Sequence, residues 1–154
     1  ISIRRGLLPS YTAAATEPLS PDFLMWQSFG EYLLDLIGNR KVKIAEIAVG
    51  KFDKIYKILE EKKNIDVIKT DIDPDNENII KDDITNPNFD LYKEVCLIYS
   101  IRPPNELQPY LVNLANEINC QLIIKTLTNE DLNTGRFNMK LKNYKKASFY
   151  TLWW

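Results

Sequence analysis

The junction between one short strand and the helix after it constrains the fold of this chain more than any other feature. Residues 44–50 read Ile-Ala-Glu-Ile-Ala-Val-Gly, an apolar run of strand length that closes on Gly50. A helical pattern follows over residues 52–62, and Asp71 ends the next apolar run, about one strand-to-strand step of a βαβ unit after Gly50. The junction therefore predicts an open α/β sheet whose first ligand-binding crevice lies beyond this turn.

The same alternation of strands and helices continues along the chain. A first helix is predicted from Ser20-Pro21-Asp22, which supplies a cap, a first-turn proline and an acid, to the stop signal Gly38. Apolar residues spaced three and four apart predict another helix over 107–118. Further strands are predicted at residues 65–70, 79–80, 95–99 and 122–125. An alternating pattern over 137–152 predicts an antiparallel hairpin, so the fold expected is an α/β, Rossmann-like, doubly wound and mainly parallel sheet with a C-terminal hairpin.

Composition narrows the classes of function. A net charge of −1 provides no overall electrostatic attraction for nucleic acid. Histidine is absent, which removes the commonest general base, the commonest zinc ligand and every Ser-His or Cys-His nucleophile. No apolar run approaches the roughly 20 residues that span a membrane, so a cytoplasmic location is expected. The oligomeric state is not predicted.

The chain of 154 residues has the length of one domain. Residues 1–19 contain no acid before Glu17 and are rich in small residues, so they are expected to be a tail or extension outside the fold, with 20–154 forming a single domain. Cys96 and Cys120 do not form a C-x-x-C pair, and they are expected to be reduced thiols beside the core rather than redox or metal ligands.

Several polar residues fall where ligands bind in such sheets, beyond the carboxyl ends of the strands. Asp71 is the expected acceptor for two ribose hydroxyls, with a turn or cap aspartate as the alternative. Of the adjacent Asp82 and Asp83, one is expected to receive an adenine amino group and the other to be a solvated loop acid. A metal held by this pair is less favoured. The residues at these strand ends are Glu46, Gly50, Asp71, Asp83, Ser100 and Arg102.

The sequence lacks the glycines that cradle a phosphate. The chain has five glycines, of which only Gly50 lies in the first turn, and neither G-x-G-x-x-G nor G-x-x-x-x-G-K-[ST] occurs. A ligand that carries adenosine without phosphate is therefore favoured over nicotinamide dinucleotides and nucleoside triphosphates.

The loop over residues 46–52 resembles the [DE]-x-G-x-G-x-G first motif of class I S-adenosylmethionine-dependent methyltransferases. Asp71 matches their second-strand acid, Asp83 matches their adenine-side acid, and Ser100 begins a stretch that lies where they carry an N/D-P-P-Y-like motif. The resemblance implies a strand order of 3-2-1-4-5 and S-adenosylmethionine as the ligand. Its cofactor-binding residues would be Glu46, Gly50, Asp71, Asp83 and Ser100.

Residues 25–152 resemble more closely the UPF0146 family, an archaeal family of uncharacterised proteins. The resemblance rests on a Glu-x-x-x-Gly-x-Phe loop, on Thr-Asp-Ile, and above all on the stretches Asp82–Pro87 and Tyr99–Pro104. It implies a methyltransferase-like fold and a domain that begins near Met25, but no established reaction.

These features leave several hypotheses open. In the first, the domain binds S-adenosylmethionine or a related adenosine ligand, and methyl transfer is its reaction if it is an enzyme. In the second, it is a non-catalytic binding or regulatory module that keeps the fold. Ala48 and Phe52 favour this alternative, because their side chains replace glycines and narrow the methionine slot. An enzyme acting on a phosphorylated nucleotide is disfavoured by the glycine count.

Arg102 and Pro103 are predicted to bind the substrate. A residue before proline is restricted to extended conformations, so Arg102 is expected to aim its guanidinium from a stiff base into the crevice near Ser100. There it would bind a carboxylate or phosphate. The alternative is a surface arginine that pairs with Asp83 or Glu106.

Overall fold

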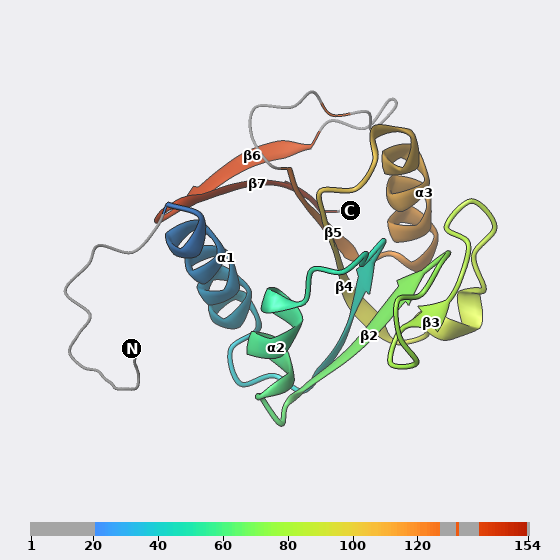
Figure 1. Ribbon diagram of the computed structural model, residues 1–154, viewed down its shortest axis with the longest axis horizontal. Helices are drawn as coiled ribbons and strands as arrows, with labels where there is room; N and C mark the ends of the chain where they lie inside the picture. The colour runs from blue at the N-terminus through green and yellow to red at the C-terminus, as the bar shows by residue number, and fades with distance from the viewer. Residues whose placement is uncertain (1–20, 127–131, 133–138, 154) are drawn as a thin grey trace, which may run out of the picture.

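The computed structural model describes residues 21–126, 132 and 139–153, which form one mainly parallel sheet with helices on both of its faces (Figure 1). The helices within these residues are α1 (Pro21–Ile37), α2 (Lys54–Glu60) and α3 (Gln108–Ile118), with 3-10 turns η1 (Phe89–Tyr92) and η2 (Asn105–Leu107). The strands are β1 (Val42–Ile47), β2 (Ile65–Asp71), β3 (Ile80–Lys81), β4 (Val95–Ile101), β5 (Gln121–Lys125), β6 (Lys140–Tyr144) and β7 (Ala147–Leu152).

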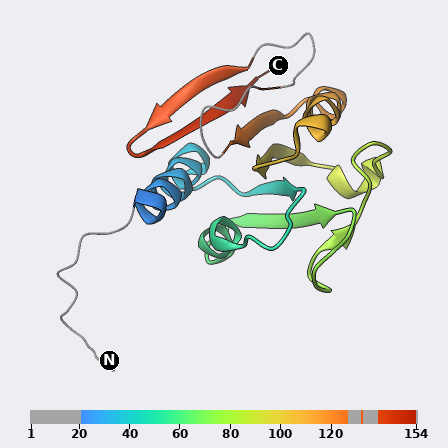
Figure 2. The same ribbon diagram turned by 45° about the horizontal axis from the view of Figure 1, so that its top comes forward.

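The order of the strands confirms the predicted topology. The described strands run β3-β2-β1-β4-β5-β7-β6, and the first five are parallel to one another. β7 is antiparallel to β5, and β6 is antiparallel to β7, so the hairpin continues the sheet beyond β5 (Figure 2). The order 3-2-1-4-5 with a terminal hairpin is the doubly wound arrangement expected for this chain.

Each face of the sheet is covered by its own apolar core. Helices α1 and α2 pack on one face, where Phe29, Leu33, Tyr99 and Phe149 are buried together. Helix α3 covers the opposite face, and its apolar residues pack with Ile98 of β4. A parallel sheet that is buried on both faces needs nearly continuous apolar runs, and these occur at residues 97–99 of β4 and 122–124 of β5.

The ends of the elements differ in detail from the sequence prediction. Helix α1 ends before Gly38, whose φ of +61° is a conformation that glycine adopts without strain. Helix α2 begins two residues later than predicted. Phe52 precedes the helix, and its ring centre lies 4.4 Å from that of Trp26 on α1. The predicted cap Ser20, the tail 1–19 and the start of the predicted hairpin lie outside the described residues. Within the part described, no helix is both long and apolar enough to cross a membrane.

Candidate functional site

A cavity of about 670 Å³ lies beyond the carboxyl ends of strands β1 to β4. The sheet order reverses between β1 and β4, and this is the position where open α/β sheets bind ligands. Its walls come from the loops after these four strands: residues 47–52, Asp71 and Ile72, residues 82–85, and Ile101, Arg102, Pro104 and Leu107.

The structure brings four of the predicted site residues together around this cavity. Gly50, Asp71, Asp83 and Arg102 all line it, although they come from four different loops. The remaining three do not line it: Glu46, Ser100 and Pro103 are buried beside or behind its walls.

Asp71 ties the loop after β1 to the loop after β2. Its Oδ2 accepts a hydrogen bond of 2.8 Å from the backbone N–H of Gly50, and its Oδ1 accepts one of 2.9 Å from the N–H of Asp73. Asp71 therefore has the turn role that was the alternative in the sequence analysis. Each carboxylate oxygen still has a second lone pair, so the turn role leaves room for ligand hydroxyls.

The loop after β1 has a left-handed backbone at two positions, of which only one is occupied by glycine. Ala48 and Gly50 both have φ of +60°, in the left-handed region. The N–H of Ala48 donates to the carbonyl of Thr70 at 3.0 Å, which fixes the loop to β2. Ala48 thus holds a conformation that favours glycine at one of the positions where the methyltransferase motif has glycine.

Replacing Ala48 by glycine is expected to raise the free energy of unfolding by about 0.5 to 1 kcal/mol. The substitution removes the cost of a side chain in the left-handed region, which outweighs the extra freedom of glycine in the unfolded chain. Chemical denaturation measures the change. The matched control is Ala45→Gly in strand β1, which should lower stability because that alanine is fully buried in the sheet. A less stable Ala48→Gly variant would contradict the strain argument.

The wall after β3 carries two carboxylates with different surroundings. Asp82 accepts hydrogen bonds from the Asn88 N–H at 3.0 Å and from the hydroxyl of the buried Tyr92 at 2.8 Å. Asp83 accepts both of its bonds on Oδ1, from the hydroxyl (2.7 Å) and the N–H (3.0 Å) of Thr85. These bonds lower the pKa of Asp83, so it is charged at neutral pH. Its Oδ2 has no protein partner among the described residues.

Glu46 belongs to a buried polar row behind the cavity. Across the sheet its Cα is in register with those of Lys69 on β2 and Tyr99 on β4, and all three side chains are buried. The Tyr99 hydroxyl donates a 2.8 Å hydrogen bond to Glu46 Oε1. Burial raises the pKa of Glu46 to about 7, and it also raises that of Tyr99, which keeps its proton. Glu46 does not reach the cavity, so it can affect a bound ligand only by positioning neighbouring residues.

Ser100 and Pro103 shape the β4 wall from behind. The fully buried Ser100 hydroxyl donates to the carbonyl of Ile47 at 2.7 Å and so joins β4 to β1 just below the cavity. Pro103 is buried, and Pro104 lines the cavity in its place. Neither predicted residue presents its side chain to the cavity.

Arg102 lines the cavity, but its backbone differs from the prediction. Its φ is +52°, in the left-handed region, whereas the following proline led us to expect an extended residue. The Arg102 N–H donates to the Lys125 carbonyl at 2.7 Å, which prolongs the β4–β5 pairing to the point where the chain must leave the sheet. The side chain is exposed, and its guanidinium carbon lies 5.4 Å from the centre of the Phe52 ring and 5.5 Å from that of Trp26.

Sequence reasoning missed the aromatic support of the cavity wall. Trp26 has the spacing of an ordinary core residue of α1, so no pattern connects it with Arg102, which is far away in the sequence. Phe52 offered a weak signal, because a large apolar residue directly after a glycine turn needs a partner to cover it.

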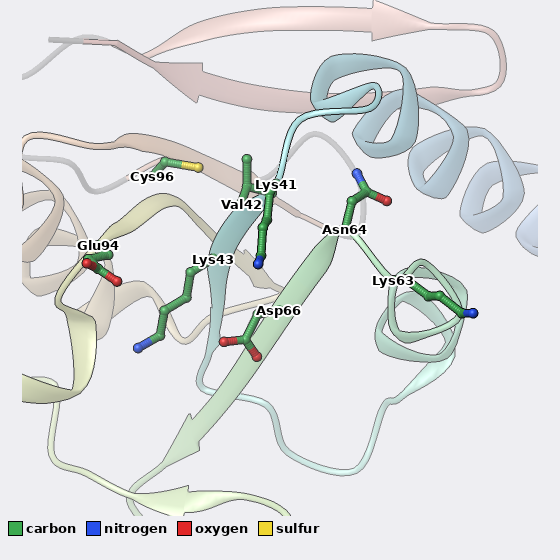
Figure 3. A pocket seen from close by; sticks show the side chains of 8 residues that line it. All are labelled: Lys41, Val42, Lys43, Lys63, Asn64, Asp66, Glu94 and Cys96. Carbon is green, nitrogen blue, oxygen red and sulfur yellow. The ribbon is translucent and has the colours of Figure 1, made fainter.

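A second depression, of about 510 Å³, lies at the opposite ends of the strands. Figure 3 shows Lys41, Lys43 and Asp66 around it, whereas Lys63 extends away from them. Cys96 is exposed there, and Cys120 is buried, which raises the pKa of its thiol to about 12. Nowhere in residues 21–126, 132 and 139–153 are three or more Cys, Asp, Glu or His side chains grouped to hold a metal ion.

The order and direction of the strands define a Rossmann-like fold that is similar to the fold of methyltransferases. One similar solved structure is a SAM-dependent methyltransferase from Aquifex aeolicus, with a TM-score of 0.52 and 11% identity over 87% of this chain and 97% of that chain. Another is the antibiotic-resistance methyltransferase Kmr, with a TM-score of 0.50 and 8% identity over 79% of this chain and 91% of that chain. At such identities the similarity establishes the fold alone.

The chain belongs to the UPF0146 family. The sequence pattern described as "Uncharacterised protein family (UPF0146)" matches residues 26–153. A UPF0146 protein of Methanothermobacter thermautotrophicus is 37% identical over 126 residues, covering 82% of this chain and 93% of the relative. A UPF0146 protein of Methanocaldococcus jannaschii is 44% identical over 124 residues, covering 73% of this chain and 84% of the relative. The resemblance seen in the sequence is therefore confirmed.

Proposed function

We propose that this domain binds S-adenosylmethionine or a related adenosine ligand in the cavity beyond β1 to β4. The observation that carries the proposal is the position of Asp71, a carboxylate at the end of β2 that faces the cavity and is held by the Gly50 N–H. The cavity volume of about 670 Å³ lies within the range of small-molecule sites, about 300 to 1,000 Å³.

In this proposal each cavity residue binds a different part of the ligand. The free lone pairs of Asp71 accept the ribose hydroxyls, and Gly50 lets the backbone approach the ligand closely. Asp83 uses its Oδ2 for the adenine amino group, beside the apolar side chains of Ile72 and Ile84. Glu46, Ser100 and Pro103 act indirectly: Glu46 through Tyr99, Ser100 by holding Ile47, and Pro103 by supporting the turn after β4.

Methyl transfer is the reaction that such a ligand supplies, and it requires mainly proximity and alignment, so a chain without histidine can perform it. A non-catalytic binding module is the second candidate. It is favoured by the position of Ser100, which replaces the motif's Asn or Asp and gives its hydroxyl to the Ile47 carbonyl instead of the cavity.

Calorimetry with S-adenosylmethionine and S-adenosylhomocysteine tests the proposal. Both should bind, and Asp71→Asn should weaken each by at least about tenfold, or about 1.4 kcal/mol, because the ribose hydroxyls lose a charged acceptor. The matched control is Asp66→Asn, on the same strand but in the opposite depression, which should bind like the wild type. The melting temperature shows whether Asp71→Asn also lowers the stability of the protein.

The result that contradicts the proposal is the absence of heat and of a thermal shift with both compounds. Binding that survives Asp71→Asn unchanged would instead assign Asp71 to the turn alone. If the ligand binds but labelled methyl groups are never transferred from S-adenosylmethionine to acceptors in an archaeal extract, the non-catalytic alternative is supported.

A further inference from the structure

Arg102 has a support that ordinary surface arginines lack. Its guanidinium carbon lies 5.4 Å from the ring centre of Phe52 and 5.5 Å from that of Trp26, and these two rings lie 4.4 Å apart. We call Phe52 and Trp26 the aromatic shelf. A guanidinium stacked on aromatic faces keeps the N–H groups at its edge available, so the shelf fixes the cation without consuming its hydrogen-bond donors.

The backbone under Arg102 is also specialised. A bulky residue in the left-handed region is uncommon, and it persists only where the surrounding structure holds it there. Here the hydrogen bond from the Arg102 N–H to the Lys125 carbonyl does so. Asparagine or glycine would suit this turn better, so a long cationic side chain at this position points to a role in the cavity.

The charges around the cavity are divided between its two sides. Asp71, Asp82 and Asp83 contribute three carboxylates from the loops after β2 and β3. The cations that line it are Lys51 and Arg102. Lys51 Nζ lies 3.9 Å from Asp75 Oδ1. None of the ion pairs between described residues includes Arg102, which is therefore available to an anion from outside.

We infer that Arg102, held on the aromatic shelf, binds a carboxylate or phosphate group of the molecule that occupies the β4 side of the cavity. Arg102 is then the residue that selects for an anionic ligand, and Phe52 replaces a motif glycine because its ring carries this arginine. The inference deepens the proposed function. It depends on that function only in assuming that a nucleoside occupies the rest of the cavity. The anion comes either from the amino-acid tail of the adenosine ligand or from a second, anionic substrate.

The test follows the Nε–H signal of Arg102 in the ¹⁵N spectrum of the full chain, with inorganic phosphate as the probe. Arg102→Lys identifies the signal by its loss, and Arg40→Lys is the matched control. Arg40 caps helix α1 by donating to the carbonyls of Ile37 and Leu36 and does not line the cavity. Phosphate should shift the Arg102 signal. The affinity for phosphate, measured by calorimetry in each variant, should fall at least tenfold in Arg102→Lys and about threefold in Phe52→Leu.

Two nucleosides distinguish the sources of the anion. S-adenosylhomocysteine carries a carboxylate, and 5′-methylthioadenosine lacks it. If Arg102→Lys weakens only the former, the anion is the tail of the adenosine ligand. If both nucleosides bind unchanged while phosphate binding falls, the anion belongs to a second substrate.

The inference is overturned if neither phosphate nor S-adenosylhomocysteine moves the Arg102 signal, or if Arg102→Lys binds both like the wild type. The failure of both nucleosides to bind the wild type contradicts the proposed function instead. The phosphate titration still decides the role of Arg102 in that case.

Discussion

Replacing Phe149 by alanine is expected to lower the free energy of unfolding by about 3 to 5 kcal/mol. Phe149 lies on β7, is 0% exposed, and its ring centre is 5.2 Å from Phe29 and 4.5 Å from Tyr32, both on helix α1. The substitution leaves a cavity between the hairpin and the helix. Since domains are stable by only about 5 to 15 kcal/mol, the variant should be marginal. Urea denaturation measures the loss.

The matched control for this prediction is Leu141→Ala on the neighbouring strand β6. Leu141 is 57% exposed, so its truncation should change stability by no more than about 0.5 kcal/mol. If Phe149→Ala lowered the free energy of unfolding by less than about 1 kcal/mol, the hairpin would contribute little to the stability of the core. The proposal of a single domain that extends through the hairpin would then fail.

The second large effect concerns Glu46 and pH. Burial raises the pKa of this carboxyl from its ordinary value of 4.5 to about 7 in the folded protein. Between these two pH values the folded protein keeps a proton that the unfolded chain has released, so stability falls as the pH rises through this window. The loss is about 3 kcal/mol, because each pKa unit corresponds to about 1.4 kcal/mol.

Glu46→Gln should remove this dependence, because an amide does not titrate. Its Oε1 can still accept the hydrogen bond from Tyr99. The free energy of unfolding of the variant minus that of the wild type should rise by about 3 kcal/mol from pH 4.5 to pH 8. This change does not depend on which of the two is more stable at the lower pH. Denaturation at several pH values measures this difference. Glu77→Gln in an exposed loop is the control and should follow the wild-type profile; a parallel profile for Glu46→Gln would rule out the buried titration.

The two departures from the methyltransferase motif have different structural outcomes. Ala48 keeps the left-handed backbone of a glycine, so the path of the loop is preserved at a cost in strain. Phe52 instead turns its ring towards Trp26 on helix α1 and contributes to the cavity wall. A cavity of about 670 Å³ remains beside it, so the substitution reshapes the site without filling it.

Local patterns in the sequence were enough to predict the mainly parallel α/β sheet with its C-terminal hairpin. The spacing of apolar residues located most of the strands and helices and indicated a mainly parallel sheet. The strand order 3-2-1-4-5 came from the resemblance to methyltransferases. The sequence also predicted that Gly50, Asp71, Asp83 and Arg102 would meet, since residues at the carboxyl ends of neighbouring parallel strands share one edge of the sheet. That prediction needs only local patterns and the geometry of the sheet.

The side chains that reach the cavity could not be identified without the folded structure. Glu46 and Ser100 also lie at the carboxyl ends of their strands, yet the register with Tyr99 and the carbonyl of Ile47 draws their polar groups into the interior. The Arg102 guanidinium lies over two aromatic rings because helix α1 brings Trp26 beside Phe52. Burial and ring contacts depend on residues that are far apart in the chain, and no local pattern encodes such contacts.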